Sequence, residues 1–141
     1  MRKHLLLALL APTLWMNAAF ADPTYIEKMS GLTAVCTIDA ISQQLEVNSA
    51  ARKYGEGSKK WSDAFHHRLS VVRSCADDAK NKGKVLYKAE AERLPALKPE
   101  LAEMYVSWLG YLDHLTDEDR DSYQRAYELS ANRLKASVDA I

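Results

Sequence analysis

The sequence predicts an all-α fold, built as a four-helix up-down bundle with one intramolecular disulfide. Apolar residues recur every three or four positions through most of residues 25–141, which is the period of an amphipathic helix. No stretch alternates between apolar and polar residues as a half-buried strand does. Glycine and proline interrupt the helical pattern at a few places. These breaks leave four main helices, with a kinked or short extra helix around residues 84–98.

The N-terminus has the three parts of a secretory signal peptide. Residues 1–4 are basic, residues 5–16 are apolar, and residues 19–21 have the small-x-small form of a signal peptidase site. The apolar run is too short for a transmembrane helix, which needs about 20 residues. We therefore expect cleavage between Ala21 and Asp22, export to a bacterial periplasm, and a single helical domain over residues 22–141.

The charge and composition of the exported part limit its partners. The full chain has 19 basic and 19 acidic residues, and loss of Arg2 and Lys3 leaves 17 − 19 = −2 with histidine neutral. Nucleic-acid-binding domains carry a basic surplus, so nucleic acid is not an expected partner. No stretch after the signal peptide has the length of a membrane span. No Asn is followed two residues later by Ser or Thr, which favours a periplasm over a eukaryotic secretory route.

The first helix is expected to begin near Tyr25 and to continue to about Ala51. Thr24 and Glu27 have the spacing of a capping box. Gly55 and Gly57 mark the first break in the helical pattern. The helix carries one broad apolar band, which consists of Tyr25, Met29, Leu32, Val35, Cys36, Ile38, Ile41 and Leu45.

The second helix is expected to begin after Ser58 and to end near Lys82. Ser58 is a favourable N-cap residue, and Gly83 is a favourable residue to follow a helix C-terminus. The apolar face consists of Trp61, Phe65, Leu69, Val72, Cys75 and Ala79. A separate helical piece over residues 84–93 is then expected to end before Pro95.

The third and fourth helices are predicted from their first turns. Pro99 and Glu100 are typical of a helix start, and Thr116 is the expected N-cap of the last helix, with acidic residues 117–119 in its first turn. The third helix presents Leu101, Met104, Tyr105, Trp108, Tyr111, Leu112 and Leu115. The fourth presents Tyr123, Tyr127, Ser130, Leu134, Val138 and Ile141.

The only two cysteines of the chain, Cys36 and Cys75, are predicted to form a disulfide. If the first helix ends near Ala51 and the second begins near Lys59, the two thiols lie at nearly the same height, roughly 22–24 Å from the connecting turn. An oxidising compartment favours the bond. Free buried thiols and a redox pair are the alternatives. The redox pair has neither a C-x-x-C spacing nor an adjacent base to support it.

No residue pattern indicates catalysis or a cofactor. Neighbouring His66 and His67 point about 100° apart on a helix and do not chelate together. Asp63 and His67 share a helix face, and His114 is a conceivable third ligand, but no recognised metal-binding motif accompanies them. We interpret these histidines as surface residues, and we expect no catalytic residues, no metal and no cofactor.

Aromatic residues cluster in the last two helices and have two open interpretations. They either pack between those helices or form a partly exposed docking patch for another protein. Tyr105 and Trp108 lie on the expected core face, whereas Tyr111 is the residue expected to be most exposed. The candidate partner-binding residues are Tyr105, Trp108, Tyr111, Tyr123 and Tyr127.

The functional expectation is a non-catalytic, exported protein-binding domain. An immunity or inhibitor protein that acts on a periplasmic effector or hydrolase has this size and this lack of catalytic groups. The alternatives are a periplasmic helical chaperone or stress protein, and a bundle that binds a metal or a small ligand. The sequence does not determine the partner or the oligomeric state.

Overall fold

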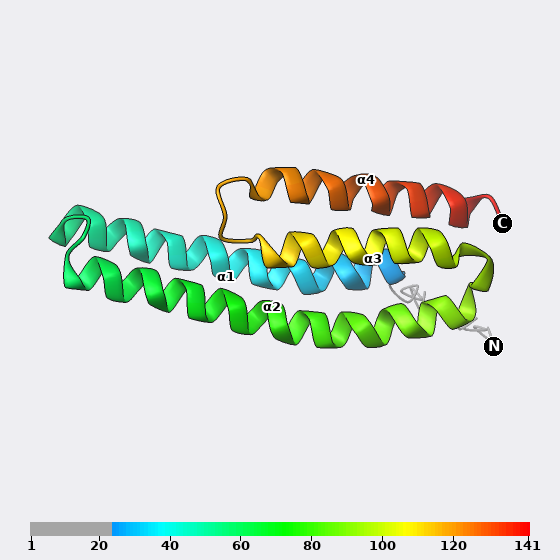
Figure 1. Ribbon diagram of the computed structural model, residues 1–141, viewed down its shortest axis with the longest axis horizontal. Helices are drawn as coiled ribbons and strands as arrows, with labels where there is room; N and C mark the ends of the chain where they lie inside the picture. The colour runs from blue at the N-terminus through cyan, green and yellow to red at the C-terminus, as the bar shows by residue number, and fades with distance from the viewer. Residues whose placement is uncertain (1–23) are drawn as a thin grey trace, which may run out of the picture.

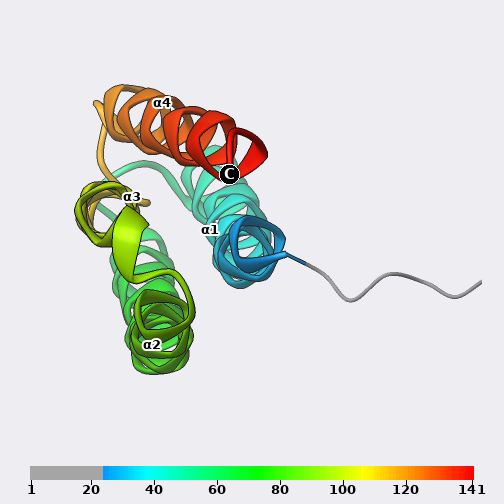
Figure 2. The ribbon, with the colours of Figure 1, turned by 90° about the vertical axis from the view of Figure 1, so that its right-hand side faces the viewer.

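A computed structural model describes residues 24–141, which form four helices in antiparallel succession. They are α1 (Tyr25–Tyr54), α2 (Lys59–Arg93), α3 (Lys98–Asp113) and α4 (Arg120–Asp139), with a short 3₁₀ helix, η1 (Pro95–Leu97), before α3. Successive helices run in opposite directions (Figure 1), and seen end on they occupy the four corners of a bundle (Figure 2). The predicted all-α, up-down fold is confirmed. The predicted signal peptide and its cleavage site lie outside the described residues.

The ends of the α1–α2 hairpin follow the predicted local chemistry. The Thr24 hydroxyl accepts a hydrogen bond from the Glu27 amide, and the Glu27 carboxylate accepts one from the Thr24 amide, which completes the capping box. Ser58 accepts a hydrogen bond from the amide of Trp61 and caps α2. Gly55 and Gly57 have φ angles of 86° and 80°, a region that favours glycine, so both glycines shape the turn.

The prediction that α2 ends near Lys82 is wrong, because the helix continues through Gly83 to Arg93. Gly83 is buried, and a Cβ atom built on it would lie 2.4 Å from Cη2 of Trp108 and 3.2 Å from Cε of Met29. The glycine therefore lets α3 approach α2 closely, and it does not terminate a helix. Residues 84–93, predicted as a separate piece, belong to the same helix.

The predicted break before the third helix is confirmed and is short. Pro95 opens η1, and Pro99 lies in the first turn of α3, where its missing amide hydrogen removes no helical hydrogen bond. Leu97 is buried at the corner between the helices. This corner reverses the chain so that α3 packs on α2.

The prediction that Thr116 caps the last helix is wrong, because α4 begins at Arg120. Leu115 is 2% exposed and anchors the connection in the core. Arg68 of α2 donates a hydrogen bond of 3.3 Å to the carbonyl oxygen of Thr116. These two contacts hold the connection as successive turns, so the acidic residues 117–119 precede the helix.

The four helices have unequal lengths, which gives the molecule a protruding end. Helices α1 and α2 contain 30 and 35 residues, whereas α3 and α4 contain 16 and 20. The shorter pair covers only the half of the hairpin that lies away from the α1–α2 turn (Figure 1). Among the described residues, no helix combines the length and the apolar content that a membrane crossing requires.

The core fills the covered half of the hairpin, and the disulfide lies within it. Cys36 and Cys75 are bonded, and their Cα atoms are 5.5 Å apart. Cys36 lies 54 − 36 = 18 residues before the end of α1, and Cys75 lies 75 − 59 = 16 residues after the start of α2. The predicted alignment of the two thiols is therefore confirmed. The largest fully buried side chains are Trp108, Met29, Leu101, Met104, Leu112, Leu115 and Leu134.

Replacement of Gly83 by Ala should destabilise the bundle, although alanine is the better helix former. The added methyl group would collide with Trp108, and overpacking of about 1–3 kcal/mol exceeds the helix-propensity gain of about 1 kcal/mol. Gly31→Ala is the matched control, because nothing lies within 4 Å of a Cβ atom there. Urea unfolding should show a lower free energy for Gly83→Ala and a higher one for Gly31→Ala. Equal increases for both variants would contradict the close packing.

Loss of the disulfide should lower the free energy of unfolding by about 4 kcal/mol, since the bond links residues 39 positions apart and restricts the unfolded chain. The measurement is urea unfolding of the Cys36→Ser/Cys75→Ser double variant and of the reduced wild-type chain. Both should lose similar stability, and reductant should have no further effect on the double variant. An unchanged midpoint after reduction would contradict the prediction.

Candidate interaction surface

Helix α1 carries two apolar stripes on opposite sides. The inner stripe consists of Met29, Cys36, Ala40 and Val47, all of which are buried. The second, which we call the outer stripe, consists of Val35, Ile38, Ile41 and Leu45, and these side chains are 58%, 65%, 51% and 62% exposed. At about 100° per residue the two stripes lie on nearly opposite sides of the helix. Folding therefore buries one stripe and leaves the other in solvent.

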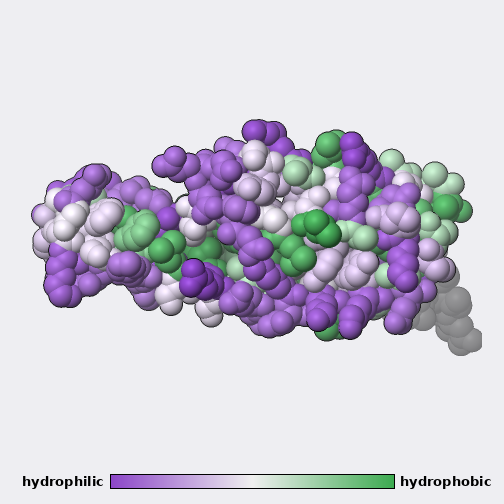
Figure 3. All heavy atoms as spheres, in the orientation of Figure 1, coloured by the Kyte–Doolittle hydropathy of each residue, from purple (hydrophilic) through white to green (hydrophobic). Residues whose placement is uncertain are grey.

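No described part of the bundle covers the outer stripe. Helices α2, α3 and α4 all lie to one side of α1 when the bundle is seen end on (Figure 2). The face shown in Figure 3 has another character, because hydrophilic residues cover most of it and hydrophobic residues appear in small separate groups. The outer stripe is a continuous row of four large aliphatic residues over about three helical turns.

A row of hydroxyl groups fixes the rotation of α1 and so keeps the outer stripe in solvent. Trp108 donates from Nε1 to Oγ1 of Thr33 at 2.6 Å and to the carbonyl oxygen of Met29 at 3.2 Å. The hydroxyls of Ser30 and Tyr127 share a hydrogen bond of 2.8 Å. Rotation of α1 to bury the outer stripe would break these bonds and leave buried polar groups unpaired.

The predicted aromatic residues separate into buried and partly exposed members. Trp108, Tyr111 and Tyr127 are buried, with exposures of 0%, 5% and 6%, whereas Tyr105 and Tyr123 are half-buried. The expectation that Tyr111 is the most exposed is wrong, because its ring stacks on Tyr127 and its hydroxyl donates to Gln124 at 3.3 Å. Partner binding by the aromatic group stays a prediction, for which Tyr105 and Tyr123 offer accessible surface.

Two buried tyrosine hydroxyls differ in whether they have a partner. Burial raises the pKa of Tyr25 well above its usual range, and its hydroxyl has no hydrogen-bond partner among the described residues. Burial also raises the pKa of Tyr127, and the hydrogen bond from Ser30 opposes the shift. Both groups therefore favour the neutral form in the folded state. Their contribution to stability is present below pH 10 and is lost as the pH rises beyond the unfolded pKa of about 10.

His114, the conceivable third metal ligand, lies with residues other than Asp63 and His67. Within residues 24–141, one group of three candidate ligand atoms lies within 4.8 Å, and it consists of His114, Asp117 and Asp119 rather than of Asp63, His67 and His114. His114 bonds Asp117 through Nδ1 at 2.7 Å and stacks on the ring of Tyr123. These contacts order the α3–α4 connection.

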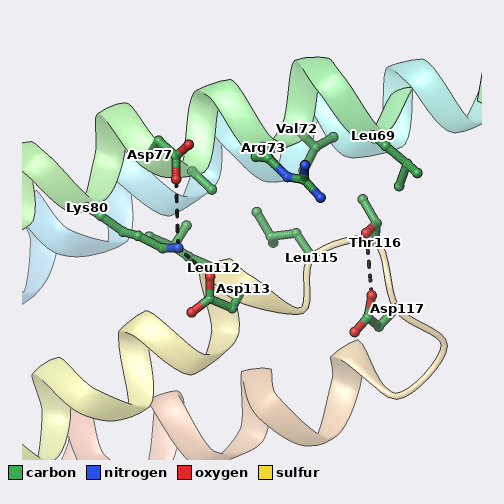
Figure 4. Close-up of a pocket in the computed structure, with 11 residues that line it drawn as sticks. Leu69, Val72, Arg73, Asp77, Lys80, Leu112, Asp113, Leu115, Thr116 and Asp117 are labelled. Carbon is green, nitrogen blue, oxygen red and sulfur yellow. Dashed lines mark hydrogen bonds and ion pairs between the residues drawn. The ribbon is translucent and has the colours of Figure 1, made fainter. Parts of the chain in front are cut away.

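A small cleft lies between α2 and the α3–α4 connection (Figure 4). Its volume is ≈ 350 Å³, and Leu115 forms part of its wall. Lys80 bonds Asp113 and lies 4.0 Å from Asp77, so the lysine offsets part of the negative charge at the rim. The guanidinium group of Arg73 points toward the connection (Figure 4). The cleft thus offers little beyond one arginine to a ligand.

A larger groove of ≈ 720 Å³ lies at the end of the bundle where α1 begins. Four of its charged residues form two ion pairs, Glu90 with Arg93 and Lys135 with Asp139. Its volume is in the range of small-molecule sites, which use a few converging polar groups for specificity. The apolar part of the lining consists of Tyr25, Ile26, Leu86, Ala89, Leu101, Leu134 and Val138.

Sequence reasoning missed the outer stripe, although the sequence contains the signal for it. Helical spacing alone predicts one broad apolar band on the first helix. That band contains the core residues Met29 and Cys36 together with Val35, Ile38, Ile41 and Leu45. A band that wide exceeds what one side of a helix can bury in a bundle of four. Division of the band into two opposed stripes would have identified an apolar surface without an intramolecular partner.

Removal of the Tyr25 hydroxyl should stabilise the bundle, whereas removal of the Tyr127 hydroxyl should destabilise it. Tyr25→Phe eliminates an unpaired buried group and should raise the free energy of unfolding by about 1–2 kcal/mol. Tyr127→Phe breaks the bond to Ser30 and should lower it by about 1 kcal/mol. Urea unfolding at pH 7 measures both. At about pH 10.5, Tyr25→Phe should also lose less stability than the wild type does. Destabilisation by Tyr25→Phe would contradict the prediction.

Comparisons with known proteins add no further constraint to these surfaces. The chain matches no protein-family model, no curated protein and no solved structure. The geometry of the four helices, and above all the outer stripe of α1, carries the functional argument.

Proposed function

We propose that this chain is an exported, non-catalytic protein-binding domain that contacts its partner through the outer stripe of α1. The observation that carries the proposal is the exposure of four large aliphatic residues in one row, with no partner among the described residues. Contiguous apolar surface on a folded domain is typical of interaction sites. Burial of such residues on binding stabilises a complex by roughly 25 cal/mol per Å² of apolar area removed from water.

The arrangement of the stripe supports a helix-based mode of recognition. Ile38, Ile41 and Leu45 follow one another at intervals of three and four residues, the spacing by which a helix contacts a groove or another helix. The stripe lies on a helix held by a disulfide and by buried hydrogen bonds. A rigid helix face loses little conformational entropy when it binds.

The disulfide supports export as part of the proposal. Cys36 and Cys75 pair within the core, and disulfides persist in oxidising compartments such as the bacterial periplasm. The basic start, apolar run and Ala19-Phe20-Ala21 site are the sequence argument for a signal peptide. An immunity or inhibitor protein that acts on a periplasmic effector or hydrolase is the specific form that we propose, because the small size of the chain, its disulfide and its exposed apolar row suit a protein that works by binding.

The groove at the open end of the bundle favours a second candidate, a small-ligand-binding protein. Its volume of ≈ 720 Å³ and mostly apolar lining would suit an apolar molecule. A ligand that binds there would cover the partly exposed side chains of Leu86 and Val138 and would leave the outer stripe free. A helical chaperone would instead use an apolar concavity, whereas the outer stripe lies on the outside of one helix.

Site-specific photo-crosslinking in the exporting cell tests the proposed surface. A photoreactive residue in place of Ile38 should give a discrete covalent adduct with a protein. The matched control is Val106 on α3, which is 66% exposed and lies outside the outer stripe, and it should give no such adduct. Ile38→Ser should leave the melting temperature of the dilute chain nearly unchanged, because most of the side chain is in solvent. Absence of an adduct at position 38, or identical adducts at both positions, would overturn the proposal.

A further inference from the structure

We propose that the partner of the outer stripe is a second copy of this chain, bound antiparallel along α1 so that Ile38 of each copy faces Ile41 of the other. The inference rests on the proposed function and names its partner. Three features of the molecule support it: the spacing of the stripe, the charges at its two ends, and the unequal lengths of the helices.

The spacing of the stripe is that of a short coiled-coil seam. The seam consists of Ala34, Ile38, Ile41 and Leu45, which are exposed and are separated by four, three and four residues, as alternating d and a positions of a heptad are. In an antiparallel pair, an a residue of one helix faces a d residue of the other. The residue numbers of every facing pair then have the same sum. Here Ile38 faces Ile41 and Ala34 faces Leu45, and the sum is 79 for both pairs. Two layers of isoleucine form the centre, and at each end the small Ala34 faces the larger Leu45.

The charges at the ends of the seam select the antiparallel direction. The seam continues to Glu27 at the start of α1 and to Arg52 near its end, and 27 + 52 = 79. An antiparallel pair therefore places Glu27 of each copy beside Arg52 of the other. A parallel pair would place like charges together at both ends. Hydrogen bonds from Thr24 lower the pKa of Glu27, so its carboxylate is ionised at neutral pH.

The other charges of α1 do not oppose this pairing. Asp39, Glu46 and Lys53 each follow an a position by one residue, which makes them b positions that point away from the seam. Lys28 is an e position and would lie opposite the uncharged Ser49 of the second copy, because e positions pair with each other in an antiparallel coil. The interface therefore contains no facing pair of like charges from α1.

The unequal helix lengths leave room for the second copy. Helix α4 lies along the first half of α1 and leaves the half near the α1–α2 turn uncovered (Figure 1). In an antiparallel pair, the covered half of one α1 meets the uncovered half of the other. The two α4 helices then lie at opposite ends of the dimer and do not collide. A foreign partner that binds the outer stripe would compete with the second copy.

Sedimentation velocity of the exported chain tests the dimer. Because the apolar seam spans about three turns and is smaller than a standard interface, association is expected at roughly micromolar concentration. Ile38→Glu should weaken it by more than about 100-fold, since the carboxylate would be buried without a partner. Val106→Glu is the matched control and should dimerise like the wild type. A wild-type chain that stays monomeric up to about 300 µM, or an unaffected Ile38→Glu variant, would overturn the inference.

Charge reversal tests the antiparallel register. Arg52→Glu should weaken association by roughly three- to tenfold, because it places two carboxylates together at each end. The double variant Glu27→Arg/Arg52→Glu restores an opposite pair at each end and should recover most of the affinity. Circular dichroism verifies that both variants keep the helical fold. Failure of the second substitution to restore dimerisation would overturn the antiparallel arrangement.

The crosslinking and sedimentation results separate this inference from the proposed function. An adduct at position 38 with twice the mass of the exported chain supports self-association and supports the outer stripe as a protein-binding surface. An adduct of another mass, together with a monomer in sedimentation, supports protein binding and overturns self-association. Absence of both an adduct and a dimer overturns both.

Discussion

The burial of Trp108 at the meeting of α1, α2 and α3 is the constraint on which the rest of the bundle depends. Gly83 provides the space for the ring, and a side chain at that position would occupy the same volume. Thr33 and the carbonyl oxygen of Met29 accept the indole hydrogen, so the ring is buried with its polar atom paired. These contacts set the distance between α2 and α3 and the rotation of α1. The disulfide then fixes the height of α1 relative to α2.

The rotation of α1 connects the core to the proposed function. Because the hydroxyl groups of Ser30 and Thr33 bond to residues of α4 and α3, the opposite side of the helix faces solvent. That side carries Ile38, Ile41 and Leu45, whose exposure contributes nothing to the stability of the monomer. A helix with apolar residues on both sides is typical of a core element. Here three other helices cover only one side, and we propose that an intermolecular contact removes the second side from water.

Several features of the fold could be predicted from the sequence because they depend on local chemistry. The capping box at Thr24, the Ser58 cap and the glycine turn between α1 and α2 each involve residues close in the chain. The pairing of Cys36 with Cys75 followed from their similar distances to that turn. The end of α2 and the start of α4 were placed wrongly for the opposite reason. Gly83 makes room for the ring of Trp108, and the carbonyl oxygen of Thr116 accepts a hydrogen bond from Arg68. Both contacts join residues that are distant in sequence.

The sequence by itself determined the helical class, the disulfide and the main turns, because helical periodicity and capping act within a few residues. Only the tertiary structure decided which side of α1 is buried, since both sides are apolar and nothing local distinguishes them. The choice depends on where Trp108 and Tyr127 find hydrogen-bond partners, and those residues lie 75 and 97 positions from their partners on α1. The candidate site is therefore a consequence of long-range packing, and its four residues become visible as a surface once the other helices are in place.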